Sequence, residues 1–196
     1  MTATVEAPGQ LHTAPRRSVE VSEPFPPWAL PVLWGWIESF RDRVCDDFSP
    51  KTFDEFLEHW IARAKAGTRT WGVWRDDSLG GMISVGPLNP ILAETHLVFA
   101  RRFWGRETTI PALRQVYAIA FASGFEKLQA AVFADNYQLI ALAKAIGAVE
   151  ETHPKHPLRA QTRRNGKAVD MRLISLFKED FELCQQHSPG PSSPAE

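Results

Sequence analysis

Residues 127–133 (KLQAAVF) are the stretch that most restricts what this chain can fold into. They are too apolar for a half-exposed strand, so we expect a strand in the centre of a sheet. A helical pattern from Thr108 or Thr109 to about Ser123 precedes them, and a strand pattern over 93–100 precedes that helix. Because parallel neighbours need such a crossover, we expect strand 127–133 to lie beside strand 93–100 and parallel to it.

The rest of the chain also alternates between helix and strand patterns. A capping box starts one helix, with Thr52 as N-cap and Glu55 three residues later. Asp135 or Asn136 starts another helix. The other expected elements are a weak first strand, a helix at about 27–46, a hairpin of strands 68–74 and 80–86, and strands 148–152 and 168–176. This order favours an α/β (α+β) fold, with a mixed central sheet and helices on both faces.

Length and charge limit the number of domains and the classes of partner that we expect. The 196 residues are 44% hydrophobic, which suits one domain with a sizeable core. We expect that domain at 18–186, between disordered tails at 1–17 and 187–196. The formal net charge of −1 gives no reason to expect a nucleic-acid or membrane partner. No apolar run reaches the ~18 residues of a membrane span, and no signal peptide is visible. We therefore expect a cytoplasmic protein, either a monomer or a homodimer.

The residues that could bind a metal are few and scattered. Cys45 and Cys184 lie far apart and are interpreted as reduced thiols, with one disulfide as the alternative. His153 and His156 have no acidic cluster or cysteine nearby, so we expect no metal site. These histidines belong to a basic segment, 153–167, which is expected to form a solvated hairpin loop with an Asn-Gly turn. The alternative is that this segment guides an acidic substrate.

Basic side chains and a glycine stand where strand 93–100 passes into the next helix. The segment FARRFWGRETT places three arginines and one glycine just before a helical pattern. Helix N-termini present free N–H groups and the positive end of the helix dipole, which suits an anion. The sequence therefore indicates an anion site at this junction, with a charged surface turn as the alternative.

Four strings, in order, make the chain resemble the GNAT superfamily of acyl-CoA-dependent N-acyltransferases. WGVWRDDSLGGMISV is similar to the family's second hairpin, and FWGRETTIPAL to its pyrophosphate loop and helix start. AAVFADNYQLIALAKAIGA is similar to its strand–Asn–helix–Gly block, and NGKAVDMRLISL to its last strand. The match covers about 28–183. The subtypes it resembles are the ribosomal-protein type and phage-encoded GNAT-like proteins. The resemblance implies transfer of acetyl from acetyl-CoA to a primary amine of a protein, peptide or small molecule.

The resemblance also implies which residues would hold acetyl-CoA. The backbone that ends the fourth strand of the family would face the pantetheine arm, and the loop after it would cradle the pyrophosphate. Flanking arginines would add charge-assisted donors. Carried over residue by residue, the candidates are Phe99, Ala100, Arg101 and Asn136 for the arm, Arg102 as a flanking donor, and Trp104, Gly105, Arg106, Glu107, Thr108 and Thr109 for the pyrophosphate.

Glu107 stands where the family prefers glycine. A glycine lets the backbone approach the ligand, whereas a solvated carboxylate there repels pyrophosphate by ~1 kcal/mol. Two arrangements are open. Glu107 turns outward, pairs with an arginine and leaves the helix N–H groups free, or it folds back onto them and blocks the site. The blocked arrangement would make the chain a catalytically inactive GNAT-fold binding or structural protein, of the phage-related kind.

Glu94 and His96 are the candidate catalytic residues. They open strand 93–100 and project to the same side, because side chains alternate along a strand. The resemblance places a base on this strand, so Glu94 is the first candidate to take a proton from the acceptor amine and His96 the second. The alternative is two surface side chains. Many relatives carry a Tyr as general acid on the helix after Asn136, but Tyr137 lies too early for that role.

Overall fold

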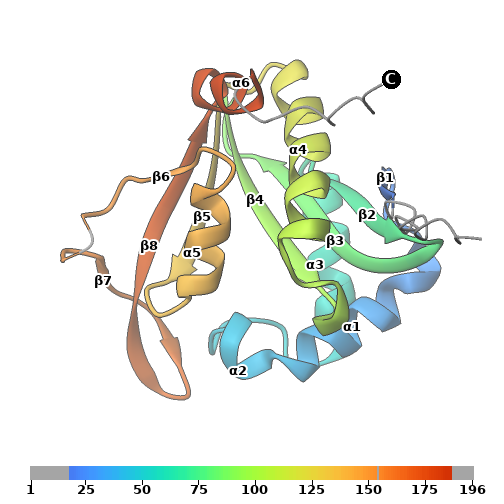
Figure 1. The fold of residues 1–196 in the computed structure, drawn as a ribbon. Helices are drawn as coiled ribbons and strands as arrows, with labels where there is room; N and C mark the ends of the chain where they lie inside the picture. The colour runs from blue at the N-terminus through green and yellow to red at the C-terminus, as the bar shows by residue number, and fades with distance from the viewer. Residues whose placement is uncertain (1–17, 154, 187–196) are drawn as a thin grey trace, which may run out of the picture.

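The structure is a computed structural model that describes residues 18–153 and 155–186. The tails expected at 1–17 and 187–196 lie outside these residues. Among the described residues, no helix is both long and apolar enough to cross a membrane. The elements, labelled in Figure 1, are β1 (Val19–Ser22), η1 (Pro27–Ala29), α1 (Leu30–Ser39), α2 (Arg41–Val44), α3 (Phe53–Lys65), β2 (Arg69–Arg75), β3 (Ser78–Pro87), β4 (Leu92–Phe99), η2 (Arg101–Phe103), α4 (Arg106–Ala122), β5 (Lys127–Phe133), α5 (Tyr137–Lys144), β6 (Val149–Glu150), β7 (Leu158–Arg164), β8 (Lys167–Phe177) and α6 (Lys178–Gln186).

The described strands form one mixed sheet in the order β1-β2-β3-β4-β5-β8-β6, with β7 paired to β8. β4 and β5 are parallel neighbours joined through α4, as the apolar pattern of 127–133 predicted. The other pairs are antiparallel. The expected fold class is thereby confirmed.

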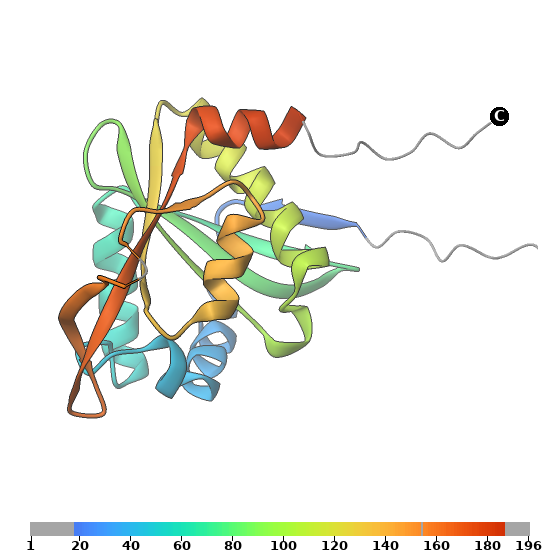
Figure 2. The same cartoon turned by 60° about the vertical axis from the view of Figure 1, so that its left-hand side comes forward.

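Helices cover both faces of the sheet and bury a separate core on each (Figure 2). On one face, α4, α5 and α6 bury residues such as Leu113, Ile140 and Phe181 against the strands. On the other, α1 and α3 bury Leu33 and Phe56. The i, i+3, i+4 spacing of apolar residues in these helices accounts for their one-sided burial.

Helix starts follow the capping chemistry of the sequence. The Thr52 hydroxyl accepts a hydrogen bond from the Glu55 N–H at the start of α3 (3.2 Å). Asn136 rather than Asp135 is the N-cap of α5, and its side chain accepts the Leu139 N–H (3.2 Å). Each cap satisfies one of the N–H groups that a helix start leaves without a partner.

Four elements differ from those expected. The helix expected at 27–46 is divided into η1, α1 and α2, with Phe40 between the last two at φ −126°. Strand 148–152 is reduced to Val149–Glu150. The basic segment 153–167 contains strand β7, although its hairpin does turn at Asn165-Gly166. Helix α6 was not expected. The side chains of β7 are exposed on both faces apart from Thr162 and Arg164, so it has no alternating pattern, and it forms through backbone pairing with β8.

Candidate active site

The site begins where β4 and β5 stop pairing. Their ladder runs only from Leu92↔Lys127 to Glu94↔Gln129. Beyond it, β4 continues to pair with β3 and β5 with β8, so the two strands diverge and leave a V-shaped gap in the sheet (Figure 1). This gap holds a cavity of about 430 Å³. Two parallel strands that part in this way expose backbone groups that a bound extended ligand can pair with.

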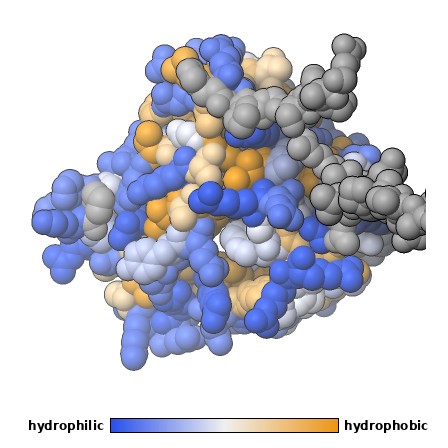
Figure 3. Space-filling view, in the orientation of Figure 1, coloured by the Kyte–Doolittle hydropathy of each residue, from blue (hydrophilic) through white to orange (hydrophobic). Residues whose placement is uncertain are grey.

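The cleft is lined by residues from both faces of the sheet. From one face come Leu113 and Tyr117 of α4 and Leu139 of α5. From the other come Ile37 of α1 and the segment 43–46 that ends α2. In the space-filling view, hydrophobic surface gathers in the central part of the face that carries α4 and α5 (Figure 3). A ligand in this cleft can therefore be reached from both sides of the sheet.

The free edge of β4 presents backbone N–H groups to the cleft. The Ala100 N–H bonds to the Gly80 carbonyl of β3 (2.9 Å). Because strand N–H groups alternate in direction, those of Phe99 and Leu97 point away from β3, toward β5. Phe99 was expected here from the sequence. Leu97 was missed, because its direction follows only from knowing which strand pairs with which side of β4.

The start of α4 lies next to this edge. Gly105 is its N-cap, with φ 155° and ψ 160°, and no side chain caps the helix. The Thr108 and Thr109 N–H groups bond back to the Gly105 carbonyl (3.2 and 2.8 Å). The N–H groups of Arg106 and Glu107 belong to the first turn, where no intrahelical acceptor exists. The segment thus has the geometry of an anion site.

Glu107 is exposed and turned to solvent. Within the described residues its carboxylate accepts no hydrogen bond from the first-turn N–H groups, and it forms no ion pair with an arginine. Thr108 and Thr109 are buried, with 1% and 0% exposure. The Thr108 hydroxyl accepts a hydrogen bond from Arg75 (2.9 Å). The backbone N–H groups of both threonines are bonded within the helix start, so the first-turn N–H groups that an incoming anion can use are those of Arg106 and Glu107.

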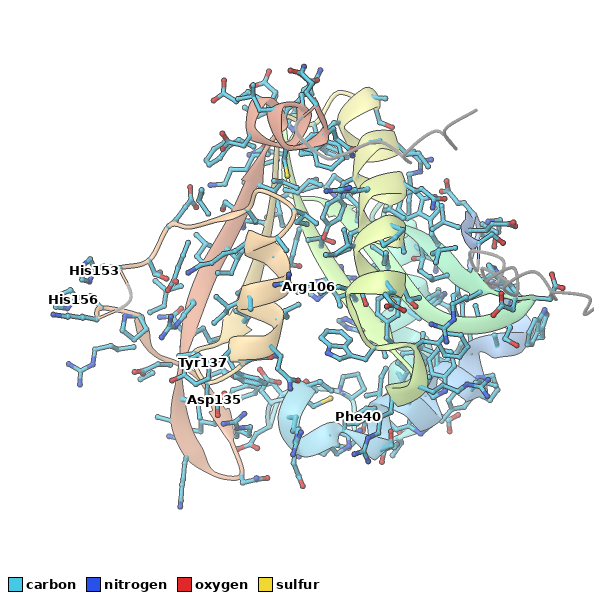
Figure 4. The ribbon with its side chains drawn as sticks, in the orientation of Figure 1. Phe40, Arg106, Asp135, Tyr137, His153 and His156 are labelled. Carbon is cyan, nitrogen blue, oxygen red and sulfur yellow. The ribbon has the colours of Figure 1, made fainter. Side chains whose placement is uncertain are left out.

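Three exposed arginines surround the helix start. Arg101, Arg102 and Arg106 form no ion pair with any described residue. Figure 4 shows Arg106 on the side of α4 that faces α5. Trp104 is 38% exposed and lies edge-on to Phe99, with ring centroids 6.0 Å apart. An anion at Gly105 would meet positive charge that no carboxylate of the described chain already neutralises.

Asn136, the N-cap of α5, also lines the cleft. Its Oδ1 is occupied as the cap of α5, so its Nδ2 remains as a donor. The neighbouring Asp135 is turned away and pairs with Arg164 (2.5 Å), which lowers the pKa of the Asp135 carboxyl below its usual value. Tyr137 is the first residue of α5 and is 67% exposed.

Glu94 and His96 lie together where the two strands part. The Glu94 Oε2 is 2.8 Å from the His96 Nε2 and 3.8 Å from an amino group of Arg63 on α3. The same Arg63 nitrogen lies 3.0 Å from Nε2. Sequence spacing indicated the pair but not Arg63, which lies on α3 and is brought in by packing alone.

The protonation of this cluster follows from the pKa of Glu94. The hydrogen bond from His96 lowers that pKa, burial opposes the shift, and the charges of His96 and Arg63 lower it further. Glu94 is thus a carboxylate at neutral pH and accepts from the Nε2–H of His96. Nε2 cannot at once donate to Glu94 and accept from Arg63, so the Arg63 contact is electrostatic. In neutral His96 the free lone pair is then on Nδ1.

Tyr117 of α4 lines the cleft and was not among the candidate residues predicted from the sequence. Its hydroxyl lies 3.1 Å from the Thr95 hydroxyl, on the other side of β4 from Glu94 and His96. Burial raises the pKa of Tyr117 to about 12, so it remains protonated at any physiological pH. It can donate a hydrogen bond in the cleft but cannot serve as a base.

The remaining candidates lie away from the cleft. His153 and His156 project at the outer edge of the molecule, beside β7 (Figure 4). Within residues 18–153 and 155–186, no group of three or more His, Cys, Asp or Glu could hold a metal ion. Cys45 and Cys184 are not joined in a disulfide, and Cys45 lines the cleft.

Comparison with known proteins identifies a family and solved structures that are similar to this chain. The sequence pattern of a family described as "Acetyltransferase (GNAT) domain" matches residues 29–149. Spermidine N-acetyltransferase from Vibrio cholerae, solved with CoA and spermine, is similar with a TM-score of 0.69 at 16% identity, over 85% of this chain and 98% of that one. Ribosomal-protein-alanine N-acetyltransferase from Brucella melitensis is similar with a TM-score of 0.66 at 17% identity, over 82% and 99%. No curated protein sequence matches the chain.

A mixed sheet that opens between two parallel strands, beside an uncapped helix start, defines the class of acyl-CoA-dependent transferases. The chain belongs to the GNAT acetyltransferase family, and it is an N-acetyltransferase whose acetyl donor is acetyl-CoA. The residues present fit that cofactor. The cleft offers an apolar slot and the edge N–H groups of β4, and the first-turn N–H groups of α4 follow the end of β4, outside the residues that line the cavity.

Proposed function

We propose that the protein transfers acetyl to a single primary amine of a protein, peptide or small molecule, with the Glu94–His96 pair accepting the amine proton. The observation that carries the proposal is the position of this pair. It stands where β4 and β5 part and lines the cleft, and an anion-type helix start follows the other end of β4. Donor and acceptor groups would thus lie along one strand.

The chain's own groups would hold the cofactor along β4. The N–H groups of Arg106 and Glu107 would bind the pyrophosphate, with the neighbouring arginines adding charge. The edge groups of Phe99 and the Nδ2 of Asn136 would bind the pantetheine arm as an added strand is bound. Bound acetyl-CoA supplies an activated acetyl thioester. The Leu97 N–H would then face the acetyl oxygen and stabilise negative charge that develops on it.

The base has to deliver an uncharged amine. A lysine side chain has a pKa near ~10.4 and an α-amino group near ~8, so both are mostly protonated at neutral pH. The His96 Nδ1 would take the proton, directly or through water, while Glu94 stabilises the imidazolium that forms. Tyr117 is protonated and lines the same cleft, where its hydroxyl can donate a hydrogen bond but not remove a proton.

The charges in the cleft favour an acceptor with one amine over a polyamine. A polyamine needs free carboxylates to pair with its further ammonium groups. Among the described residues that line the cleft, the acidic side chains are Glu94 and Asp46. Glu94 is engaged by His96, and Asp46 accepts hydrogen bonds from Thr162 and Ser49. Arg43 also lines the cleft, and its charge would repel a second ammonium group.

Cofactor binding is the first test of this function. Acetyl-CoA at ~100 times its dissociation constant should add about 2.7 kcal/mol to the free energy of unfolding. Thermal unfolding with and without acetyl-CoA or CoA measures this, and CoA release with an alanine N-terminal peptide or with spermidine then reports transfer. We expect the peptide to be the better acceptor. Absence of any shift would refute cofactor binding, and spermidine as the better acceptor would refute the single-amine proposal.

Glu107→Gly tests whether the anion site is open. Because Glu107 is exposed and does not occupy the helix N–H groups, its removal should tighten CoA binding only slightly. The gain should be on the order of ~1 kcal/mol, the energy of one solvated charge pair. Calorimetric titration of wild type and variant with CoA measures the difference. Tight binding by the variant beside no binding by wild type would mean that the site is blocked.

A further inference from the structure

Two aspartates at the end of α2 are joined to the tip of the β7–β8 hairpin. The Asp47 carboxylate accepts the N–H groups of Asn165 and Gly166, both at 2.8 Å. The Asp47 N–H donates to the Arg163 carbonyl (2.7 Å). The Thr162 hydroxyl donates to the Asp46 carboxylate (2.5 Å). Two segments that are 116 or more residues apart in sequence are thus joined by four hydrogen bonds.

The hairpin turn is shaped to receive a carboxylate. Asn165 and Gly166 have φ values of 55° and 73°, the left-handed pair of a two-residue hairpin turn. Their successive N–H groups point outward to the same side, and such a pair binds an anion well. Hydrogen bonds to an ionised acceptor are about twice as strong as neutral ones. We call this four-bond connection the hairpin latch.

The hairpin latch holds one wall of the cleft. Arg43, Val44, Cys45, Asp46 and Ser49 line the cavity on the face opposite α4 and α5. In Figures 1 and 2, α2 and the hairpin tip lie side by side at the end of the molecule where β4 and β5 diverge. On the proposed function, the cofactor lies on the α4 side, so this wall faces the acceptor.

We propose that Asp47 is a positioning residue for the acceptor side of the cleft. By fixing the segment 43–49 to the hairpin, it keeps the wall in the position that receives the acceptor amine. The effect on the acceptor rests on the proposed function, whereas the effect on the wall does not. Loss of the latch should raise the KM for the acceptor and leave kcat and CoA affinity nearly unchanged.

The labelling rate of the Cys45 thiol measures how often this wall of the cleft opens. It lines the cleft two residues before Asp47 and is partly buried. In a Cys184→Ser background, we expect Asp47→Ala to raise the rate at which a bulky aromatic disulfide labels Cys45 by about tenfold, because opening exposes the thiol. Asp47→Asn keeps one acceptor oxygen and should give an intermediate rate. Asp42→Ala removes an equal charge from α2 without touching the latch, and it should match wild type.

Transfer kinetics and CoA titration complete the test. For a peptide with a free N-terminal alanine, Asp47→Ala should raise KM by about tenfold, with kcat and the CoA dissociation constant within about twofold. A wild-type labelling rate in Asp47→Ala would overturn the proposal. A labelling rate that rises while the acceptor KM stays constant would overturn it as well. If the wild type acetylates none of the amines offered, the proposed function fails, while the Cys45 rate still decides whether Asp47 holds the wall.

Discussion

Replacing Glu94 by glutamine is expected to lower turnover by roughly 100-fold or more while acetyl-CoA affinity stays nearly unchanged. Glutamine keeps the size of the side chain but removes the charge that accepts the His96 Nε2–H at 2.8 Å. Without it, the imidazolium formed on proton uptake loses its partner and faces the Arg63 guanidinium alone. Steady-state transfer to an alanine N-terminal peptide gives turnover, and calorimetric titration gives affinity.

The pH dependence tests the charge state of Glu94. Because the His96 hydrogen bond holds the pKa of Glu94 below its usual value, Glu94 stays ionised well below neutral pH. A fall in activity on mild acidification should therefore not come from protonation of Glu94. Glu179→Gln, an exposed charge removal on α6, is the matched control and should leave turnover unchanged. Turnover in Glu94→Gln equal to wild type at every pH would assign the base to His96 alone or to water.

The fold could be predicted where local patterns and burial agree. The apolar run at 127–133 predicted a central strand, and the helix before it predicted parallel pairing with β4. Thr52, and either Asp135 or Asn136, predicted two helix starts, because a cap is a local interaction between residues three apart. These elements are specified by residues close together in sequence, so their positions can be predicted from the sequence alone.

Other elements depend on contacts that no local pattern records. The strand β7 has no alternation of apolar and polar side chains, and it is held by β8 and by Asp46 and Asp47 from far along the chain. The break between α1 and α2 falls in a helical pattern that continues through it. There Arg41 bonds the Pro50 carbonyl, a contact that the spacing of apolar residues does not reveal.

The residues of the candidate site likewise fall into those that the sequence could predict and those that it could not. Glu94 and His96 could be paired from the sequence, because alternate residues of a strand share a face. Arg63, which contacts Glu94, and Tyr117, which lines the cleft, could not, since each comes from a helix whose packing is set by the whole fold. The direction of the Leu97 N–H likewise requires knowing that β3 pairs with the other edge of β4.

Replacing Gly105 by alanine should weaken CoA binding by about 10- to 100-fold. At φ 155° and ψ 160°, Gly105 occupies a backbone region that is essentially restricted to glycine, and an L-residue there costs about 1–3 kcal/mol. An added Cβ would meet nothing within 4 Å, so the cost is torsional rather than steric. Without CoA, the Gly105→Ala variant should relieve this strain by rotating the peptide at residue 105, which turns the first-turn N–H groups away from the anion site. CoA binding then has to restore their orientation, and each 1.4 kcal/mol of that cost lowers the affinity tenfold.

Gly124, at the opposite end of the same helix, supplies the matched control. It has φ 107°, and an added Cβ there also meets nothing within 4 Å. Gly124→Ala should therefore lower the free energy of unfolding to a similar extent while leaving the CoA dissociation constant unchanged. Calorimetric titration with CoA and urea unfolding of both variants measure the two quantities. If both variants bind CoA as tightly as wild type, the backbone at Gly105 does not shape the pyrophosphate site. If both lose affinity equally, the loss comes from general destabilisation of α4, and only a loss confined to Gly105→Ala supports an anion site at its N-terminus.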